Sequence, residues 1–184
     1  MSLIAIQGIR GSYSEEAVID IVGDASILEC EDFAATFNAV RTERADYAVV
    51  PVENKIVGEI AGSVSILRSG GFREFERKPL KVRHVMAGTL DATLGTIRSV
   101  RSHIEALKQC RRYLAANSGW TQIVGADTAS SVRQIVEAND PASAAVGSRR
   151  AVEMYGAKIL AENVADDSDN WTTFCLVGRL SVGE

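Results

Sequence analysis

The stretch Asp169-Asn170-Trp171-Thr172-Thr173-Phe174-Cys175-Leu176-Val177 near the end of the chain decides how the fold is interpreted. From Thr172 onward it joins two β-branched residues to a run of apolar ones, which is typical of a buried strand. Side chains alternate along a strand, so we expect Thr172 and Thr173 to face opposite sides of a sheet. The place of this last strand determines whether the chain forms one lobe or two.

The rest of the chain alternates short β-rich segments with amphipathic helical patterns, and this alternation predicts an α/β fold. Two further strand-like stretches lie within 72–88, on either side of Pro79. The expected strands are 3–7, 27–30, 47–52, 122–125, 144–146, 158–161 and 172–177. The expected helices are 15–21, 33–44, 60–68, 102–114, 128–138 and 149–155, the first of them capped by Ser12 or Ser14.

Composition restricts the partners of this chain of 184 residues. Its net charge is -4 and it has no block of five or six basic residues, so we expect no nucleic acid partner, because phosphate binding needs clustered Lys and Arg. No apolar run approaches the roughly 20 residues that span a bilayer, so we expect no membrane segment. The ligand is therefore expected to be a small molecule or a protein.

The N-terminal residues and the cysteines bear on the compartment. The first six residues lack both a basic region and a full apolar region, so we expect no signal peptide. Cys30, Cys110 and Cys175 are odd in number and form no Cys-x-x-Cys pair, which favours reduced thiols. We expect a cytoplasmic protein.

Several short motifs follow one another along almost the whole chain. The segment Gly8-Ile9-Arg10-Gly11-Ser12-Tyr13-Ser14-Glu15-Glu16-Ala17 resembles Gly-x-x-Gly-Thr-Phe-Ser-x-x-Ala, and Pro51-Val52-Glu53-Asn54-Lys55-Ile56-Val57-Gly58 resembles Pro-x-Glu-Asn-Ser-x-x-Gly. Three later segments are Ser102-His103-Ile104-Glu105-Ala106-Leu107-Lys108-Gln109-Cys110, Asp127-Thr128-Ala129-Ser130-Ser131 and Ala144-Ala145-Val146-Gly147-Ser148. Finally, Asn170-Trp171-Thr172-Thr173-Phe174 resembles Asn-x-Thr-Arg-Phe, with Thr173 at the arginine position. In this order the motifs resemble the catalytic domain of the prephenate dehydratases.

The resemblance implies a two-lobed fold like that of type II periplasmic binding proteins, with a ligand cleft between the lobes. The last strand would return to the first lobe, so that residues 1–78 and 163–184 form one lobe and residues 79–162 form an inserted second lobe. Many members of the family carry a phenylalanine-binding ACT domain after the threonine motif. This chain ends about ten residues after Phe174, so we expect no such regulatory domain.

The activity implied by the resemblance is the conversion of prephenate to phenylpyruvate in phenylalanine biosynthesis. The substrate loses carbon dioxide and its ring hydroxyl, and the reaction requires no metal and no cofactor. The two histidines of the chain and the lack of metal-ligand spacing agree with this demand. The family's catalytic threonine corresponds to Thr172, which we expect to hydrogen-bond the leaving hydroxyl.

At two motif positions the chain has a side chain of a different chemical kind from that in the family pattern. Thr173 replaces an arginine, whose planar guanidinium suits a carboxylate, and Lys55 replaces a serine. Lys55 is thus a candidate for pairing with a substrate carboxylate or with Glu53. We expect Asn54 to bind substrate through its amide and Glu53 to orient the loop. Thr173 and Phe174 are further candidates because they complete the motif.

Three helix starts, at Ser12, at Ser102-His103 and at Thr128-Ala129-Ser130, complete the candidate site for a small dicarboxylate. The N-terminus of a helix attracts anions through its unpaired N–H groups and its dipole. We therefore expect Ser12 at the first helix, and Thr128 and Ala129 at a later one, to contact the substrate.

Three readings of function remain open at this point. The first is a prephenate dehydratase, with arogenate as an alternative substrate. The second is a related enzyme that decarboxylates prephenate without forming an aromatic ring, and the third is a non-catalytic protein that binds small carboxylates. A homodimer is the expectation for the oligomeric state.

Overall fold

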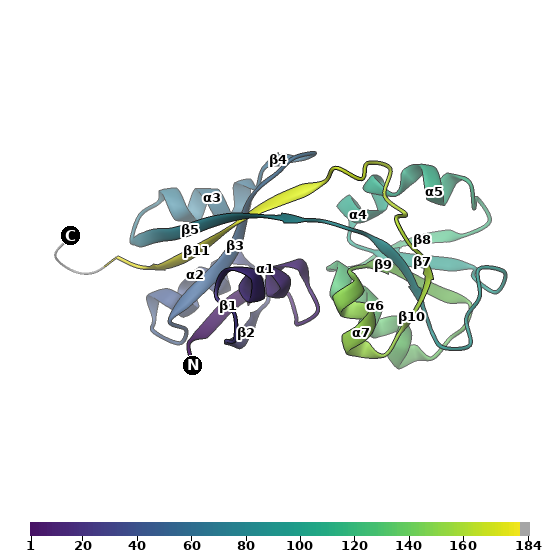
Figure 1. Cartoon of the computed structure of the whole chain (residues 1–184), viewed down its shortest axis with the longest axis horizontal. Coiled ribbons are helices and arrows are strands. Elements are labelled where there is room, and N and C mark those ends of the chain that lie inside the picture. The colour runs from purple at the N-terminus through teal and green to yellow at the C-terminus, as the bar shows by residue number, and fades with distance from the viewer. Residues whose placement is uncertain (181–184) are drawn as a thin grey trace. The chain divides into compact units, whose positions relative to one another are not determined.

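The computed structural model describes residues 1–180, which form two compact units (Figure 1). Unit 1 comprises Met1–Val82 together with the segment that begins at Asn170. Unit 2 comprises Arg83–Asp169. The chain therefore leaves unit 1 once, completes unit 2, and returns to unit 1 for its last strand.

Unit 1 is built on a sheet in which the last strand lies between strands from the first half of the chain. The order is β2-β1-β3-β11-β5, with the short β4 attached to β3. The strands β1, β2 and β3 are parallel, while β11 is antiparallel to both of its neighbours. Their bounds are β1 Leu3–Gln7, β2 Ser26–Cys30, β3 Tyr47–Asn54, β4 Gly58–Glu59, β5 Phe72–Lys81 and β11 Trp171–Arg179.

Helices cover both faces of this sheet. The helix α1 (Tyr13–Ile21) packs on a core that includes Phe174, while α2 (Phe33–Arg41) belongs to a second core that includes Cys175. The helix α3 (Ala61–Arg68) contributes to the same second core. Consecutive residues of β11 thus point into two different cores, as the alternation of side chains along a strand requires. The same alternation places the side chains of Thr172 and Thr173 on opposite faces of the sheet, as the sequence predicts.

The division between the units falls later than the boundaries expected from the sequence. Those boundaries were placed after residues 78 and 162, whereas the units divide after Val82 and Asp169. The reason is that β5 continues through Pro79, with Leu80 opposite Thr172 and Lys81 opposite Trp171. A proline is tolerated in this position because β5 is the edge strand of the sheet, where a missing N–H donor disrupts no inner pairing.

Unit 2 contains a five-stranded sheet of order β10-β6-β9-β7-β8. The strands β7, β8 and β9 are parallel, and β6 is antiparallel to β9 and β10. The strands are β6 Val85–Gly88, β7 Ser99–Ser102, β8 Thr121–Val124, β9 Ser143–Gly147 and β10 Lys158–Ala161. The helices are α4 Ile104–Gln109, α5 Arg111–Ala115, α6 Thr128–Ala138 and α7 Arg149–Tyr155.

Local sequence signals were correct for most elements but not for all. The single helix expected over 102–114 is two helices, because the chain turns at Cys110. Its cap is His103, whose Nδ1 accepts the N–H of Glu105, whereas the hydroxyl of Ser102 donates to the carbonyl of Val146. The strands β4 and β7 were not expected at all.

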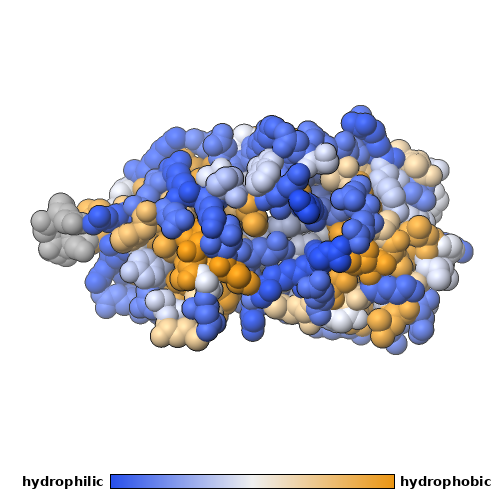
Figure 2. Space-filling view, in the orientation of Figure 1, coloured by the Kyte–Doolittle hydropathy of each residue, from blue (hydrophilic) through white to orange (hydrophobic). Residues whose placement is uncertain are grey.

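The surface of the described chain mixes polar and apolar side chains. Hydrophilic residues cover most of the face in Figure 2, and hydrophobic residues gather in an area on each unit. Along residues 1–180, no helix combines the length and apolar character needed to cross a bilayer. Cys30, Cys110 and Cys175 are free thiols, and burial raises the pKa of Cys110 and Cys175 to about 12.

Candidate active site

Most of the candidate residues lie along the side of the unit 1 sheet at which the strands β1 and β3 end. The carboxyl ends of the parallel strands β1 and β3 reach this edge, and so does the amino end of the antiparallel β11. The pairing of β11 with β3 places Thr172 opposite Asn54 and Thr173 opposite Glu53. In open α/β sheets the carboxyl ends of the strands form the usual ligand-binding edge.

Asn54 is the centre of a hydrogen-bond network at this edge. Its amide nitrogen donates to Thr172 Oγ1 at 2.9 Å, to Asn170 Oδ1 at 2.9 Å and to the carbonyl of Trp171 at 3.1 Å. Its amide oxygen accepts the N–H groups of Ile56 at 2.9 Å and Val57 at 3.0 Å. The side chain of Asn54 is buried, and its bonds to Thr172 and Asn170 are shielded from water. One residue therefore fixes both the loop after β3 and the start of β11.

The direction of the bond to Thr172 determines what that hydroxyl can do. The amide nitrogen of Asn54 can only donate, so Thr172 Oγ1 is the acceptor. Within residues 1–180 the structure gives the Thr172 hydroxyl proton no acceptor. Thr172 is 8% exposed, so its side chain is almost completely buried. The hydroxyl can therefore still donate one hydrogen bond.

The neighbours of Thr172 play different parts. Phe174 is 2% exposed and packs in the core beside α1, so it supports the strand from within. Thr173 is partly exposed, and the alternation of β11 places it on the other face of the sheet. Glu53 and Lys55 are both exposed at the end of β3, and the backbone N–H of Lys55 donates to the carbonyl of Trp171 at 2.9 Å.

The first turn of α1 contains several polar contacts that hold the start of the helix. Ser12 is the N-cap, and its hydroxyl accepts the N–H of Glu15 at 3.4 Å. The carboxylate of Glu15 is buried and accepts from the N–H of Gly11 at 2.7 Å and from Arg10 Nε at 2.9 Å. Gly8 and Gly11 have φ angles of 91° and 85°, a region that glycine adopts without strain. The oxygen of the Ser12 hydroxyl therefore caps the helix, while its proton has no acceptor among residues 1–180.

The two candidates in unit 2 lie in the first turn of α6. The cap of this helix is Asp127, whose carboxylate accepts the N–H of Ser130 at 2.7 Å. Thr128 is partly exposed, whereas Ala129 is completely buried. Part of Thr128 thus lies at the surface, and Ala129 packs inside unit 2.

Asn170 belongs to the candidate site although the sequence analysis did not select it. Its side chain is completely buried, and its amide oxygen accepts from Asn54 Nδ2. The signal was present, because Asn170 opens the threonine motif, but nothing in the sequence shows that it contacts Asn54. Among the described residues, no three His, Cys, Asp or Glu side chains gather as metal ligands would.

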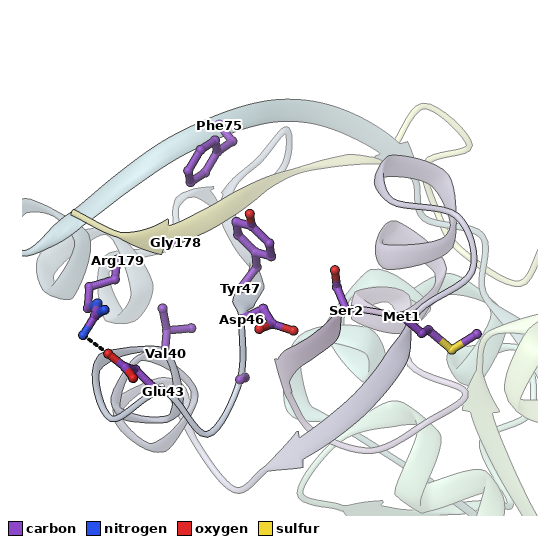
Figure 3. Close-up of a pocket in the computed structure, with 10 residues that line it drawn as sticks. Met1, Ser2, Val40, Glu43, Asp46, Tyr47, Phe75, Gly178 and Arg179 are labelled. Atoms are coloured by element: carbon purple, nitrogen blue, oxygen red, sulfur yellow. Dashed lines mark ion pairs between the residues drawn. The ribbon is translucent and has the colours of Figure 1, made fainter. Parts of the chain in front are cut away.

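A hollow of about 710 Å³ lies at the opposite edge of the unit 1 sheet (Figure 3). Tyr47 and Phe75 contribute rings that meet edge to face at 5.4 Å, and Arg179 pairs with Glu43. Tyr47 lies seven residues before Asn54 on β3, about 23 Å along a strand. The hollow is therefore separate from the network around Asn54.

A sequence model of the prephenate dehydratase family matches residues 4–181. The chain belongs to the prephenate dehydratase family. A curated relative is arogenate dehydratase/prephenate dehydratase 2, chloroplastic, of Arabidopsis thaliana, which is 34% identical over 176 residues. The match covers 96% of this chain and 46% of the Arabidopsis protein, so the chain spans about half the length of this relative.

Solved structures support the same family and fold. The prephenate dehydratase of Arthrobacter aurescens in complex with L-Phe aligns with a TM-score of 0.89 at 25% identity, over 98% of this chain and 61% of that one. A structure described as GqqA, a novel type of quorum quenching acylase, aligns with a TM-score of 0.86 at 30% identity, over 98% and 65%. The VFT2 periplasmic domain of Bordetella pertussis BvgS gives 0.51 at 14% identity over 97% and 80%, which concerns the fold alone. The expected α/β class with two lobes is confirmed.

Proposed function

We propose that this chain is a prephenate dehydratase in activity as well as in family, converting prephenate to phenylpyruvate, carbon dioxide and water. The observation that carries the proposal is the hydrogen bond from Asn54 Nδ2 to Thr172 Oγ1. It fixes the rotamer of Thr172 and leaves the hydroxyl proton for a ligand. A family match alone does not supply this arrangement.

The arrangement suits the chemistry of the reaction. As the bond between the ring and its carboxylate breaks, the electron pair enters the ring and the C–O bond of the ring hydroxyl breaks. One proton from solvent converts the departing hydroxide into water. A hydroxyl is a poor acid, so Thr172 acts by hydrogen bonding to the departing oxygen as negative charge develops on it. The donation from Asn54 to Thr172 also fixes this hydroxyl before the substrate binds.

Substrate identity is the finer part of the proposal. Prephenate and arogenate differ at one position of the side chain, which carries a keto oxygen in prephenate and an amino group in arogenate. Thr172 acts on the ring hydroxyl, which is the same in both, and Asn54 acts only by orienting Thr172. The Arabidopsis relative is named for both activities, so arogenate is the second substrate to test.

The similarity to GqqA raises an acylase as a competing function. An acylase needs a nucleophile whose proton is removed by a neighbouring base. The described neighbour of the Thr172 hydroxyl is instead the donor amide of Asn54, and no His, Asp or Glu accepts its proton within residues 1–180. The local chemistry therefore favours a hydrogen-bond donor over an activated nucleophile.

The decisive experiment follows the products from purified protein given prephenate, arogenate or an N-acylated amine. Phenylpyruvate from prephenate supports the proposal, whereas phenylalanine from arogenate alone reassigns the substrate. A non-aromatic decarboxylated keto acid would show the decarboxylase chemistry, and release of a carboxylic acid from the amide would show an acylase. Binding of prephenate without any product would show a binding protein.

The variant Thr172→Val tests the assigned role, because it keeps the shape of the side chain and removes the hydroxyl. We expect kcat to fall at least about tenfold, since hydrogen-bonding and general-acid assistance is typically worth about 10²–10⁴-fold. Thr121→Val, at an exposed position that starts β8, is the matched control and should keep the wild-type rate. An unchanged kcat in Thr172→Val would remove Thr172 from catalysis.

A further inference from the structure

Ser14 is a buried polar residue that the network around Asn54 does not use. It is the second residue of α1 and is only 7% exposed. Within residues 1–180 its hydroxyl has no hydrogen-bond partner. Its backbone N–H has no acceptor there either, because the first N–H groups of a helix lack one inside the helix. Ser14 therefore holds two hydrogen-bond donors that no described residue uses.

The hydroxyl of Ser14 is accessible to a ligand. Thr89 Oγ1 is the one side-chain oxygen within residues 1–180 that is both shut off from solvent and without a partner. Ser14 Oγ is not in this situation, so it reaches open space although most of the residue is buried. The opening lies at the start of α1, a helix of nine residues whose dipole favours negative charge at this end.

The position of Ser14 on α1 directs its side chain toward the sheet of unit 1. Ala17 and Val18 follow Ser14 by three and four residues, so the three residues share one face of the helix. Ala17 and Val18 pack with Phe174 in the core between α1 and the sheet. Ser14 thus continues this buried face by one turn toward the start of the helix.

Thr172 has the matching position on β11. It precedes Phe174 by two residues and therefore lies on the same face of the strand. Both α1 and β11 begin at the side of the sheet where β1 and β3 end, and they contact each other (Figure 1). The step from Val18 to Ser14 is about 6 Å along the helix, and the step from Phe174 to Thr172 is about 6–7 Å along the strand. The two hydroxyl groups are therefore at the same level on two elements that pack together.

We propose that Ser14 is a second hydrogen-bond donor, beside Thr172, to the oxygen that leaves the ring of the substrate. This inference rests on the proposed function and adds a catalytic residue to it. In prephenate the ring hydroxyl lies at the opposite end of the ring from the ring carboxylate and the side chain, so a residue beside Thr172 meets the same oxygen. Two donors that are fixed before the substrate binds stabilise negative charge on this oxygen as the C–O bond breaks.

The kinetic test compares Ser14→Ala with Ser65→Ala, which removes the hydroxyl of an exposed serine on α3 of the same unit. With prephenate, Ser14→Ala should lower kcat about 10- to 100-fold, because a donor of this kind is typically worth about 10²–10³-fold and the N–H of Ser14 remains. KM should change little, since the donor acts mainly in the transition state. Ser65→Ala should keep the wild-type rate.

A binding measurement makes the test independent of turnover. 4-Hydroxyphenylpyruvate carries an oxygen at the far end of its ring, whereas phenylpyruvate has none there. In isothermal titration calorimetry on the full chain, Ser14→Ala should raise Kd for 4-hydroxyphenylpyruvate about 3- to 10-fold, the size of one hydrogen bond. The Kd for phenylpyruvate should stay within about twofold of wild type, because this ligand offers no oxygen to the hydroxyl of Ser14.

A purely structural role for Ser14 would give a different result. Because the hydroxyl has no partner within residues 1–180, Ser14→Ala should not lower the thermal midpoint. An equal loss of affinity for both keto acids, or a midpoint below that of Ser65→Ala, would overturn the proposal. An unchanged kcat in Ser14→Ala would also overturn it and would leave the dehydratase activity standing.

Failure of the proposed function gives a separate outcome. A wild-type chain that does not convert prephenate refutes the dehydratase activity, and calorimetry then decides the role of Ser14. A loss of affinity in Ser14→Ala that is confined to 4-hydroxyphenylpyruvate keeps Ser14 as a donor to a ring oxygen. Equal affinities of wild type and Ser14→Ala for this ligand, or no binding to wild type at millimolar concentration, remove Ser14 from the site.

Discussion

Two polar sites, one in each unit, are organised in opposite ways. Unit 1 buries Asn54, Asn170 and Thr172 in one network, in which the amide of Asn54 alone makes five hydrogen bonds. The network contains only amides and a hydroxyl, so none of its side chains titrates near neutral pH. Unit 2 holds a partly buried guanidinium at Arg101 with no partner among residues 1–180, and a buried titratable ring at His84.

The difference shows two ways of holding polar groups. A complete neutral network holds its atoms in place before a ligand arrives, so it suits a hydroxyl that must meet a developing charge. An unpaired cation that is partly withdrawn from water stabilises its unit poorly. Unit 1 should therefore be sensitive to changes in hydrogen-bond direction, and unit 2 to changes in charge and space.

The largest effect is expected from Asn54→Asp. This change keeps the shape and the acceptor for Ile56 and Val57 but replaces the donor to Asn170 and Thr172 by another acceptor. A buried carboxylate would then face three oxygens, those of Asn170, Thr172 and the carbonyl of Trp171, and the free energy of unfolding should fall by about 2–4 kcal/mol. The Thr172 hydroxyl would also turn its proton inward, so kcat should fall at least about tenfold.

Urea denaturation and steady-state kinetics measure both effects of Asn54→Asp. Asn38→Asp, on the exposed side of α2, adds the same charge without removing a buried donor and should leave both quantities near wild type. Wild-type kinetics in Asn54→Asp would show that the direction of the Asn54–Thr172 bond has no part in catalysis.

Sequence alone could predict those features that depend on neighbouring residues. The alternation of strands and helices gave the α/β class, and Ser12 was expected as a cap because a serine precedes a helix with acids in its first turn. The opposite directions of Thr172 and Thr173 followed from the pleat of a strand. Pro79 was misleading, because a proline ends an inner strand but is tolerated on an edge, and edge position is not visible in the sequence.

The sequence alone could not predict contacts between residues that lie far apart along the chain. Asn54 and Asn170 are 116 residues apart, and only the pairing of β3 with β11 brings them together. Likewise, His84 showed no partner in the sequence, and its contact with Gln109 depends on how α4 packs in unit 2. Whether Arg101 has a partner depends on all the residues around its side chain, so no local sequence pattern could predict it.

Gly125→Ala tests how tightly unit 2 is packed around Arg101. The added methyl would lie 2.4 Å from Ser131 Oγ and 3.3 Å from Arg101 Cγ, so the start of α6 or the arginine must move. Overpacking of this kind typically costs about 1–3 kcal/mol. Gly119→Ala is the matched control, because a Cβ there meets nothing within 4 Å. Thermal denaturation of both variants measures the loss of stability. Equal thermal midpoints would mean that the residues beside Gly125 move without cost when the methyl group is added.

The smallest expected effect is a pH dependence of the unfolding free energy, which we expect from His84 in unit 2 and not from the neutral network in unit 1. Burial lowers the pKa of His84 below its ordinary value of 6.5, although the hydrogen bond to Gln109 acts in the other direction. The unfolded chain therefore binds the proton more readily, and stability from this group is complete above about pH 6.5 and decreases as the pH falls below it. The loss is at most about 1.4 kcal/mol per pH unit.

His84→Gln, which can still donate to Gln109, should reduce the difference in unfolding free energy between pH 7.5 and 5.5, whereas His103→Gln should not. If both variants keep the wild-type difference, the pH dependence comes from carboxylates and the contrast between the units does not extend to titration.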